Sequence, residues 1–87
     1  MYTILVYDMG EKRVGKALKT CRKYLQWIQN SVFEGDITEA KLERLKYELH
    51  CIMDRDVDSV VIFKFRTQVE ITKEIMGIER NSTDNIF

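Results

Sequence analysis

The stretch that most constrains the fold is the apolar run near the amino end, Tyr2-Thr3-Ile4-Leu5-Val6-Tyr7-Asp8. Six residues with strong strand preference lead to one carboxylate, and Met9-Gly10 then interrupts the run, so we expect a strand that ends at Asp8. Alternation places Ile4, Val6 and Asp8 on one face and Thr3, Leu5 and Tyr7 on the other. Both faces are largely apolar, so both require cover. A chain of 87 residues has few elements with which to provide it, and this favours a partner subunit.

The composition is typical of a single globular domain, with 45% hydrophobic residues, 32% charged residues and no net charge. The apolar runs are far shorter than the ~20 residues needed to cross a bilayer, and nothing resembles a signal peptide. We therefore expect a cytoplasmic protein that makes no membrane contact. Cys21 and Cys51 follow no metal-ligand spacing, so we expect reduced, packed thiols, with a disulfide as the alternative. His50 is the single histidine of the chain, so we expect no zinc site there.

Basic residues are concentrated between positions 12 and 23, where no acidic residue interrupts them. Four lysines recur there at helical spacing and form what we call the basic ridge: Lys12, Lys16, Lys19 and Lys23. Such a ridge fits contact with nucleic-acid phosphates, and it equally fits a solvated helix face.

Apolar residues at helical spacing predict two helices, one from Gly10 to about Leu25 and one from Glu39 to about Met53, with Thr38 as the N-cap of the second. Their expected buried stripes are Val14, Ala17, Leu18, Cys21 and Leu25 in the first helix and Leu42, Leu45, Leu49 and Ile52 in the second.

Further strands are expected over residues 27–37, as one strand bent or split near Asn30-Ser31, over residues 58–65, and more weakly over residues 69–76. This order predicts a ferredoxin-like α+β domain over residues 1–77, in which two helices cover one face of an antiparallel sheet. The other face would remain apolar, which predicts a sheet-to-sheet homodimer. The tail, residues 78–87, is expected to be disordered or to pair with a partner subunit through Ile86 and Phe87.

Asp8 is the main candidate for chemistry. A lone aspartate after a strand is usually a cap, but a two-fold axis near the strand end would bring two copies of Asp8 together. Two close carboxylates repel unless a proton or a cation neutralises them, and Mg²⁺ commonly takes one or two carboxylates plus water. A metal in that place could activate water and neutralise a scissile phosphate.

Three further residues are candidate nucleic-acid contacts. Arg13 could hold a phosphate through bidentate contacts, or it could form an ordinary surface ion pair. Ser31 could orient a water or a phosphate. Phe33 could stack on a base, or it could belong to the core or the dimer interface.

Tyr7-Asp8 at the end of the first strand, Arg13 in the first helix and the segment Gln29-Asn30-Ser31-Val32-Phe33-Glu34-Gly35 together resemble the CRISPR-associated Cas-two (Cas2) family. The resemblance covers essentially the whole chain and extends to Asp58-Ser59-Val60. It implies a ferredoxin-like homodimer in which Asp8 of both subunits holds Mg²⁺ at the dimer junction, with Arg13, Ser31 and Phe33 in or near the cleft.

The resemblance also implies two activities. Some members are metal-dependent nucleases acting on single-stranded RNA or double-stranded DNA. Others serve as the central spacer between two dimers of the Cas-one integrase during spacer acquisition. Family C-terminal segments commonly add a strand to the opposite subunit's sheet, a role open here to residues 69–76 or 84–87.

Two other functions remain open for a chain of this design. One is a toxin-type small RNase of the same fold. The other is a non-catalytic ferredoxin-like module that binds RNA or a ligand, for which Phe63-Lys64-Phe65 is a faint echo of the paired aromatic residues of RNA-recognition domains.

Overall fold

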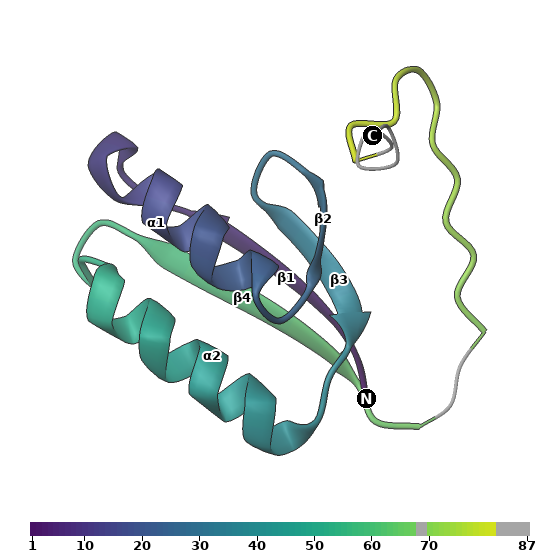
Figure 1. Cartoon of the computed structure of the whole chain (residues 1–87), viewed down its shortest axis with the longest axis horizontal. Coiled ribbons are helices and arrows are strands. Elements are labelled where there is room, and N and C mark those ends of the chain that lie inside the picture. The colour runs from purple at the N-terminus through teal and green to yellow at the C-terminus, as the bar shows by residue number, and fades with distance from the viewer. Residues whose placement is uncertain (68–69, 82–87) are drawn as a thin grey trace.

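The computed structural model describes residues 1–67 and 70–81 and has the ferredoxin-like α+β fold (Figure 1). In chain order the elements are β1 (Tyr2–Asp8), α1 (Glu11–Arg22), β2 (Gln26–Gln29), β3 (Val32–Asp36), α2 (Glu39–Ile52) and β4 (Ser59–Phe65). The strands form one antiparallel sheet in the order β2-β3-β1-β4, and both helices pack on one face of it. The predicted fold class is therefore confirmed.

Strand β1 lies inside the sheet, as its two apolar faces require. It pairs with β3 along one edge and with β4 along the other. The expected alternation is confirmed, because Thr3 and Leu5 are 0% exposed and Tyr7 is 3% exposed beneath the helices. These side chains join the core, whose buried hydrophobic members are Leu5, Tyr7, Ala17, Cys21, Leu25, Phe33, Ile37, Leu42, Leu45 and Leu49.

The helices follow the predicted stripes with two differences. Helix α1 ends at Arg22, earlier than expected, and Leu25 is buried just beyond it. Val14 is exposed, because the first turn of α1 projects past the sheet. In α2 the stripe is as predicted, and the Thr38 hydroxyl accepts the Lys41 backbone N–H at 3.2 Å, which confirms the N-cap.

Both cysteines are free, as expected, but only Cys21 is packed. Burial raises the pKa of its thiol to about 12, so it stays protonated. Cys51 is exposed on α2, which corrects the expectation that both thiols would be packed.

Residues 27–37 form a hairpin, the split version of the predicted strand. Asn30 adopts a left-handed conformation (φ 47°), which asparagine tolerates better than most residues, and the chain reverses there between β2 and β3. The Trp27 indole N–H donates to the Asn30 carbonyl at 2.9 Å and closes the turn.

The strand predicted over residues 69–76 is wrong for its described part, residues 70–76, which have no strand conformation. A strand requires a neighbouring strand with which to pair, and this segment leaves the sheet after β4. Lys73 nevertheless forms an ion pair with Glu34 of β3 through its side chain. Val69 and the tail residues Ile86 and Phe87 lie outside the described residues.

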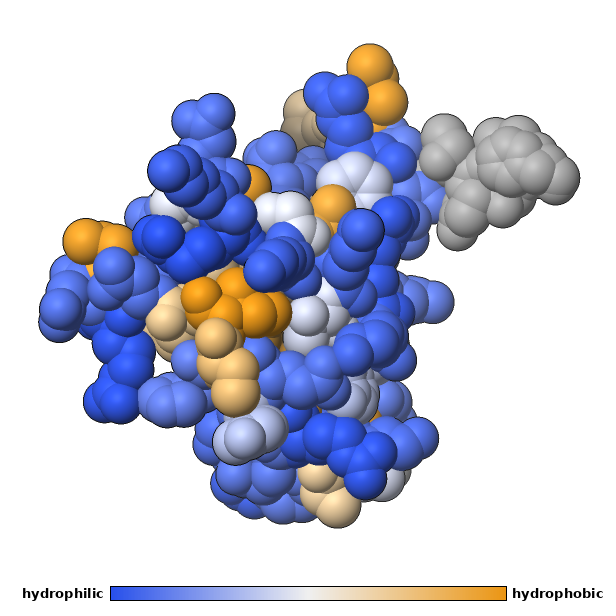
Figure 2. All heavy atoms as spheres, turned by 60° about the vertical axis from the view of Figure 1, so that its left-hand side comes forward, coloured by the Kyte–Doolittle hydropathy of each residue, from blue (hydrophilic) through white to orange (hydrophobic). Residues whose placement is uncertain are grey.

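On the sheet face opposite the helices, the part formed by β1 and β4 is apolar and partly exposed within the described chain. Its register places Ile4 and Val6 of β1 beside Phe63 and Val61 of β4. Val61 is 47% exposed and Phe63 is 51% exposed. We call these four residues and their neighbours Tyr2 and Phe65 the open sheet face. Figure 2 shows that apolar patches interrupt the hydrophilic surface on the side of the molecule that it draws.

Candidate metal and nucleic-acid site

One end of the sheet gathers several of the predicted site residues. Asp8 ends β1, and Ser59, the first residue of β4, lies directly opposite it in the register. The hairpin turn reaches the same end, where the Tyr7 backbone N–H donates to the Ser31 carbonyl at 3.2 Å. Helix α1 begins one short loop later, at Glu11. The sheet thus brings Asp8, Ser31 and the start of α1 together, as the sequence interpretation requires.

Asp8 is exposed and lies on the same side of the sheet as Val6 and Val61. Its carboxylate therefore stands at the margin of the open sheet face. In the part of the chain that the structure describes, no three His, Cys, Asp or Glu side chains form a group able to hold a metal. One carboxylate suits Mg²⁺, which retains several waters, and a second copy of the chain would add a second carboxylate. The oxygen donor of Asp8 is of the kind that Mg²⁺ accepts, and a magnesium ion would need further ligands from water or from a second copy of the chain.

Arg13 is held by a carboxylate that the sequence interpretation did not assign to the site. Its Nε donates to Asp58 Oδ2 at 2.5 Å and its Nη2 donates to Asp58 Oδ1 at 2.9 Å. The surface ion pair that was the alternative for Arg13 is therefore present. The Arg13 side chain is still 28% exposed, whereas that of Asp58 is 0% exposed.

Asp58 also accepts two backbone N–H groups. Gly10 donates to it at 2.9 Å and Asp54 donates at 2.8 Å. The Arg13 hydrogen bonds, together with these backbone donors, hold the pKa of Asp58 well below its usual range, against the opposing effect of burial. The carboxylate is consequently ionised throughout the physiological range, and it ties the β1–α1 loop to the turn before β4.

Phe33 does not fit the role of a base-stacking residue in this structure. It is 0% exposed, and its ring stacks on Tyr7 beneath the helices with 6.0 Å between the ring centres. The strand register sets it opposite Leu5, on the covered face. Phe33 is therefore a core residue, the alternative that the sequence left open.

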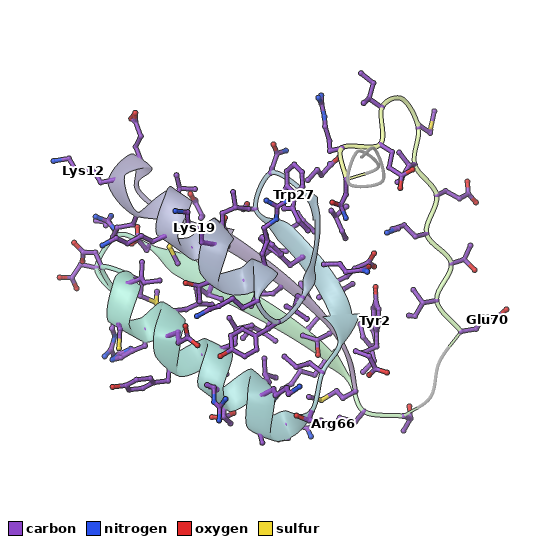
Figure 3. The ribbon with its side chains drawn as sticks, viewed as in Figure 1. Tyr2, Lys12, Lys19, Trp27, Arg66 and Glu70 are labelled. Carbon is purple, nitrogen blue, oxygen red and sulfur yellow. The ribbon has the colours of Figure 1, made fainter. Side chains whose placement is uncertain are left out.

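The basic ridge lies along α1, and Figure 3 shows Lys12 projecting from its first turn. Lys12, Lys16 and Lys19 are exposed and have no ion-pair partner among the described residues. Lys23 differs, because it forms an ion pair with Glu48 of α2, which also accepts the Tyr24 hydroxyl. The part of the ridge available to a ligand is thus Lys12, Lys16 and Lys19, which extend from the first turn of α1 to its last.

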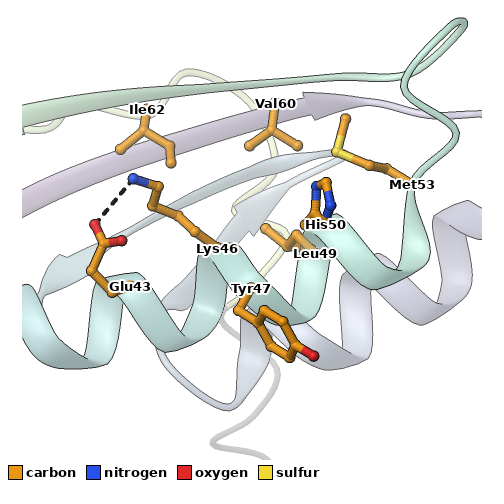
Figure 4. A pocket seen from close by; sticks show the side chains of 8 residues that line it. All are labelled: Glu43, Lys46, Tyr47, Leu49, His50, Met53, Val60 and Ile62. Carbon is orange, nitrogen blue, oxygen red and sulfur yellow. Dashed lines mark hydrogen bonds and ion pairs between the residues drawn. The ribbon is translucent and has the colours of Figure 1, made fainter.

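A separate hollow of about 470 Å³ lies between α2 and β4 (Figure 4). Leu49, Val60 and Ile62 line it together with His50, and Lys46 pairs with Glu43 at its rim at 3.0 Å. The hollow flanks the edge strand β4, on the helix-covered side of the sheet. It is thus distinct from the margin of the open sheet face where Asp8 lies.

No helix within residues 1–67 and 70–81 has the length and apolar character required to span a membrane.

Comparison with known proteins adds four findings. The family model described as CRISPR associated protein Cas2 matches residues 1–72. A relative from Dictyoglomus turgidum, named CRISPR-associated endoribonuclease Cas2, is 50% identical over 100% of both chains. A solved Cas2 crystal structure superposes with a TM-score of 0.81 at 39% identity, covering 92% of this chain and 90% of that one. For Streptococcus pyogenes Cas2 the TM-score is 0.69 at 32% identity, with 75% and 86% covered.

Proposed function

Since this chain belongs to the CRISPR-associated Cas2 family, we propose that it is a homodimeric, Mg²⁺-dependent phosphodiesterase that acts on RNA or DNA in the cytoplasm. In this proposal it also serves spacer acquisition as a nucleic-acid-binding subunit in complex with the Cas-one integrase. The observation that carries the proposal is the position of Asp8 at the margin of the open sheet face. A second copy docked on that face would bring a second carboxylate to the same edge.

The metal, when bound, would supply an activated water and neutralise charge on the scissile phosphate. Asp8 of the two subunits would hold it. Arg13, which keeps three of its five N–H donors after binding Asp58, would position the phosphate. Ser59, directly opposite Asp8 in the register, would offer its hydroxyl group to the substrate or its waters, and Ser31 would do so from the hairpin turn that contacts Tyr7.

Binding to a longer nucleic acid would use the free part of the basic ridge, Lys12, Lys16 and Lys19. A homodimer carries two such ridges, so one duplex could contact both. These lysines offer point charges to phosphates and no base-specific pattern, so binding would be tolerant of sequence and strongly dependent on salt.

The test is the Asp8→Asn variant, which keeps the size of the side chain and removes its charge. We expect cleavage of a single-stranded RNA in Mg²⁺ to fall at least about a hundredfold while RNA binding in EDTA is retained. Asp36→Asn is the matched control, because Asp36 is an exposed aspartate at the other end of the same face. Its cleavage rate should equal that of the unaltered protein.

Unchanged cleavage by rigorously purified Asp8→Asn protein would refute the metal role of Asp8. Cleavage that persists in EDTA would favour the alternative of a metal-independent, toxin-type RNase. Absence of cleavage in the unaltered protein, with tight duplex binding, would restrict the function to the nucleic-acid-binding subunit.

A further inference from the structure

The contact between Arg13 and Asp58 has a feature that distinguishes it from an ordinary surface ion pair. The Asp58 side chain is fully buried. Its two carboxylate oxygens accept four hydrogen bonds, two from Arg13 and one each from the backbone N–H groups of Gly10 and Asp54. The guanidinium is thereby fixed in orientation by a two-point contact. A salt bridge between two mobile surface side chains would leave it free to turn.

Gly10 adds a steric element to the same arrangement. The guanidinium of Arg13 lies directly over its Cα, so a Cβ at position 10 would lie well inside 3.0 Å of Arg13 Nη2. The backbone of Gly10 has φ −61° and ψ 152°, a conformation open to any residue. A side chain at position 10 would therefore displace the guanidinium from Asp58, so this glycine contributes the space that it leaves and not its backbone freedom.

The remaining donors of Arg13 are those on Nη1 and one on Nη2. Within the described part of the chain, Nη1 donates no hydrogen bond. Because Asp58 already holds the guanidinium in place, binding of a phosphate to these N–H groups orders the Arg13 side chain at little further cost in entropy. The contact with Asp58 offsets part of the positive charge of Arg13, but it fixes the direction in which the remaining N–H groups point.

From this geometry we propose that Asp58, with Gly10, is the positioning residue of the phosphate site. It aims the guanidinium of Arg13 at a phosphate of single-stranded RNA bound beside Asp8. This inference rests on the proposed function of this end of the sheet, but it concerns binding of the substrate, which can be measured without metal and without cleavage.

The experiment measures affinity for a short single-stranded RNA in EDTA for four variants. Arg13→Gln removes the contact, Asp58→Asn weakens the hold on Arg13, and Gly10→Ala displaces the guanidinium while leaving every charge in place. Asp56→Asn is the control, because it makes the same change on an exposed residue of the same turn. We expect a loss of roughly tenfold for Arg13→Gln and a comparable loss for Asp58→Asn and Gly10→Ala, with the control unchanged.

A double variant separates positioning from general destabilisation. Asp58→Asn introduced into Arg13→Gln should cause no further loss of RNA affinity, because Asp58 acts only through Arg13. The Arg13 Nε–H resonance in a ¹H–¹⁵N spectrum should shift in Gly10→Ala, while the rest of the spectrum shows the native fold.

Three results would overturn the inference. Gly10→Ala could bind RNA as the unaltered protein does despite a shifted Nε–H resonance. Asp58→Asn could weaken binding equally in the presence and absence of Arg13. Arg13→Gln could bind with full affinity, in which case Asp58 serves only to hold the loop. If the protein proved to have no Mg²⁺-dependent cleavage activity, these measurements would still test the inference, because they record RNA binding in EDTA.

Discussion

Replacement of Phe63 by serine should dissociate the proposed homodimer. Phe63 is 51% exposed in the middle of the open sheet face, beside Ile4. A free phenylalanine side chain presents ~200 Å² of surface, so about 100 Å² of this ring remains to be covered by a second subunit. At ~25 cal/mol per Å², complete cover would contribute about 2.5 kcal/mol per subunit. If only half of that surface is covered in the dimer, the two rings together contribute roughly 2.5 kcal/mol, or about a seventyfold change in dimer Kd.

Sedimentation velocity over a range of concentrations measures this change directly. Val57→Ser is the matched control, since Val57 is an apolar residue, 69% exposed, in the turn before β4 and outside the open sheet face. The reasoning is refuted if Phe63→Ser and Val57→Ser dissociate at the same concentration. It is also refuted if the unaltered chain is monomeric at concentrations well above those used in the RNA cleavage assay.

Three other predictions concern the ridge, the core and pH. Replacing Lys12, Lys16 and Lys19 by glutamine should reduce the slope of log K against log salt for duplex binding by about 0.9 per lost phosphate contact. The same change at three basic residues of α2, Lys41, Arg44 and Lys46, should leave the slope unaltered. Equal slopes for the two triple variants would contradict the role of the basic ridge. Leu45 is 0% exposed in the core, so Leu45→Ala should lower the free energy of unfolding by about 2–5 kcal/mol in urea melts at one fixed protein concentration. A loss no greater than that of Val57→Ala, a change at an exposed residue, would contradict the burial of Leu45 in the core. Burial tends to raise the pKa of Glu34, but the hydrogen bonds from Lys73 and Tyr2 outweigh this effect and lower that pKa. The stability that Glu34 adds is therefore present above the ordinary glutamate pKa, and it is lost as the pH falls through the lowered value. The difference in unfolding free energy between the unaltered protein and Glu34→Gln should therefore be constant near neutral pH and shrink below about pH 4, and a difference that grows on acidification would contradict the assignment.

The sequence predicts the frame of the fold well because its strongest signals are local. The alternation in β1 and the leucine stripe of α2 each depend on period alone, and both are confirmed. Val14 continues the helical period of α1 yet is exposed, because period alone does not say how far a helix extends past the sheet. The segment after β4 alternates as a strand would, but alternation does not supply the neighbouring strand that its hydrogen bonds require.

The candidate site was predictable only where one segment carries the signal. Asp8 stands out at the end of an apolar run. The role of Asp58 depends on contacts with Gly10 and Arg13, which are 48 and 45 residues away in sequence, and nothing in the local pattern of residues 54–58 distinguishes it from Asp54 or Asp56. The available clues were its position directly before β4 and the family resemblance of the segment Asp58-Ser59-Val60. Phe33 illustrates the same limit, because the register that sets it opposite Leu5 decides which face it occupies.

The place of β1 within the sheet also governs how the site responds to heat. Residues 2–6 of this strand are hydrogen-bonded to neighbours on both sides, so their amide protons exchange with solvent only when β3 or β4 separates from it. Asp8 extends from a strand that is paired on both sides, whereas a carboxylate on a mobile loop would lose its position well below the melting temperature. The Asp8 carboxylate should consequently keep its place until the sheet itself opens, so that thermal inactivation and global unfolding follow a single transition.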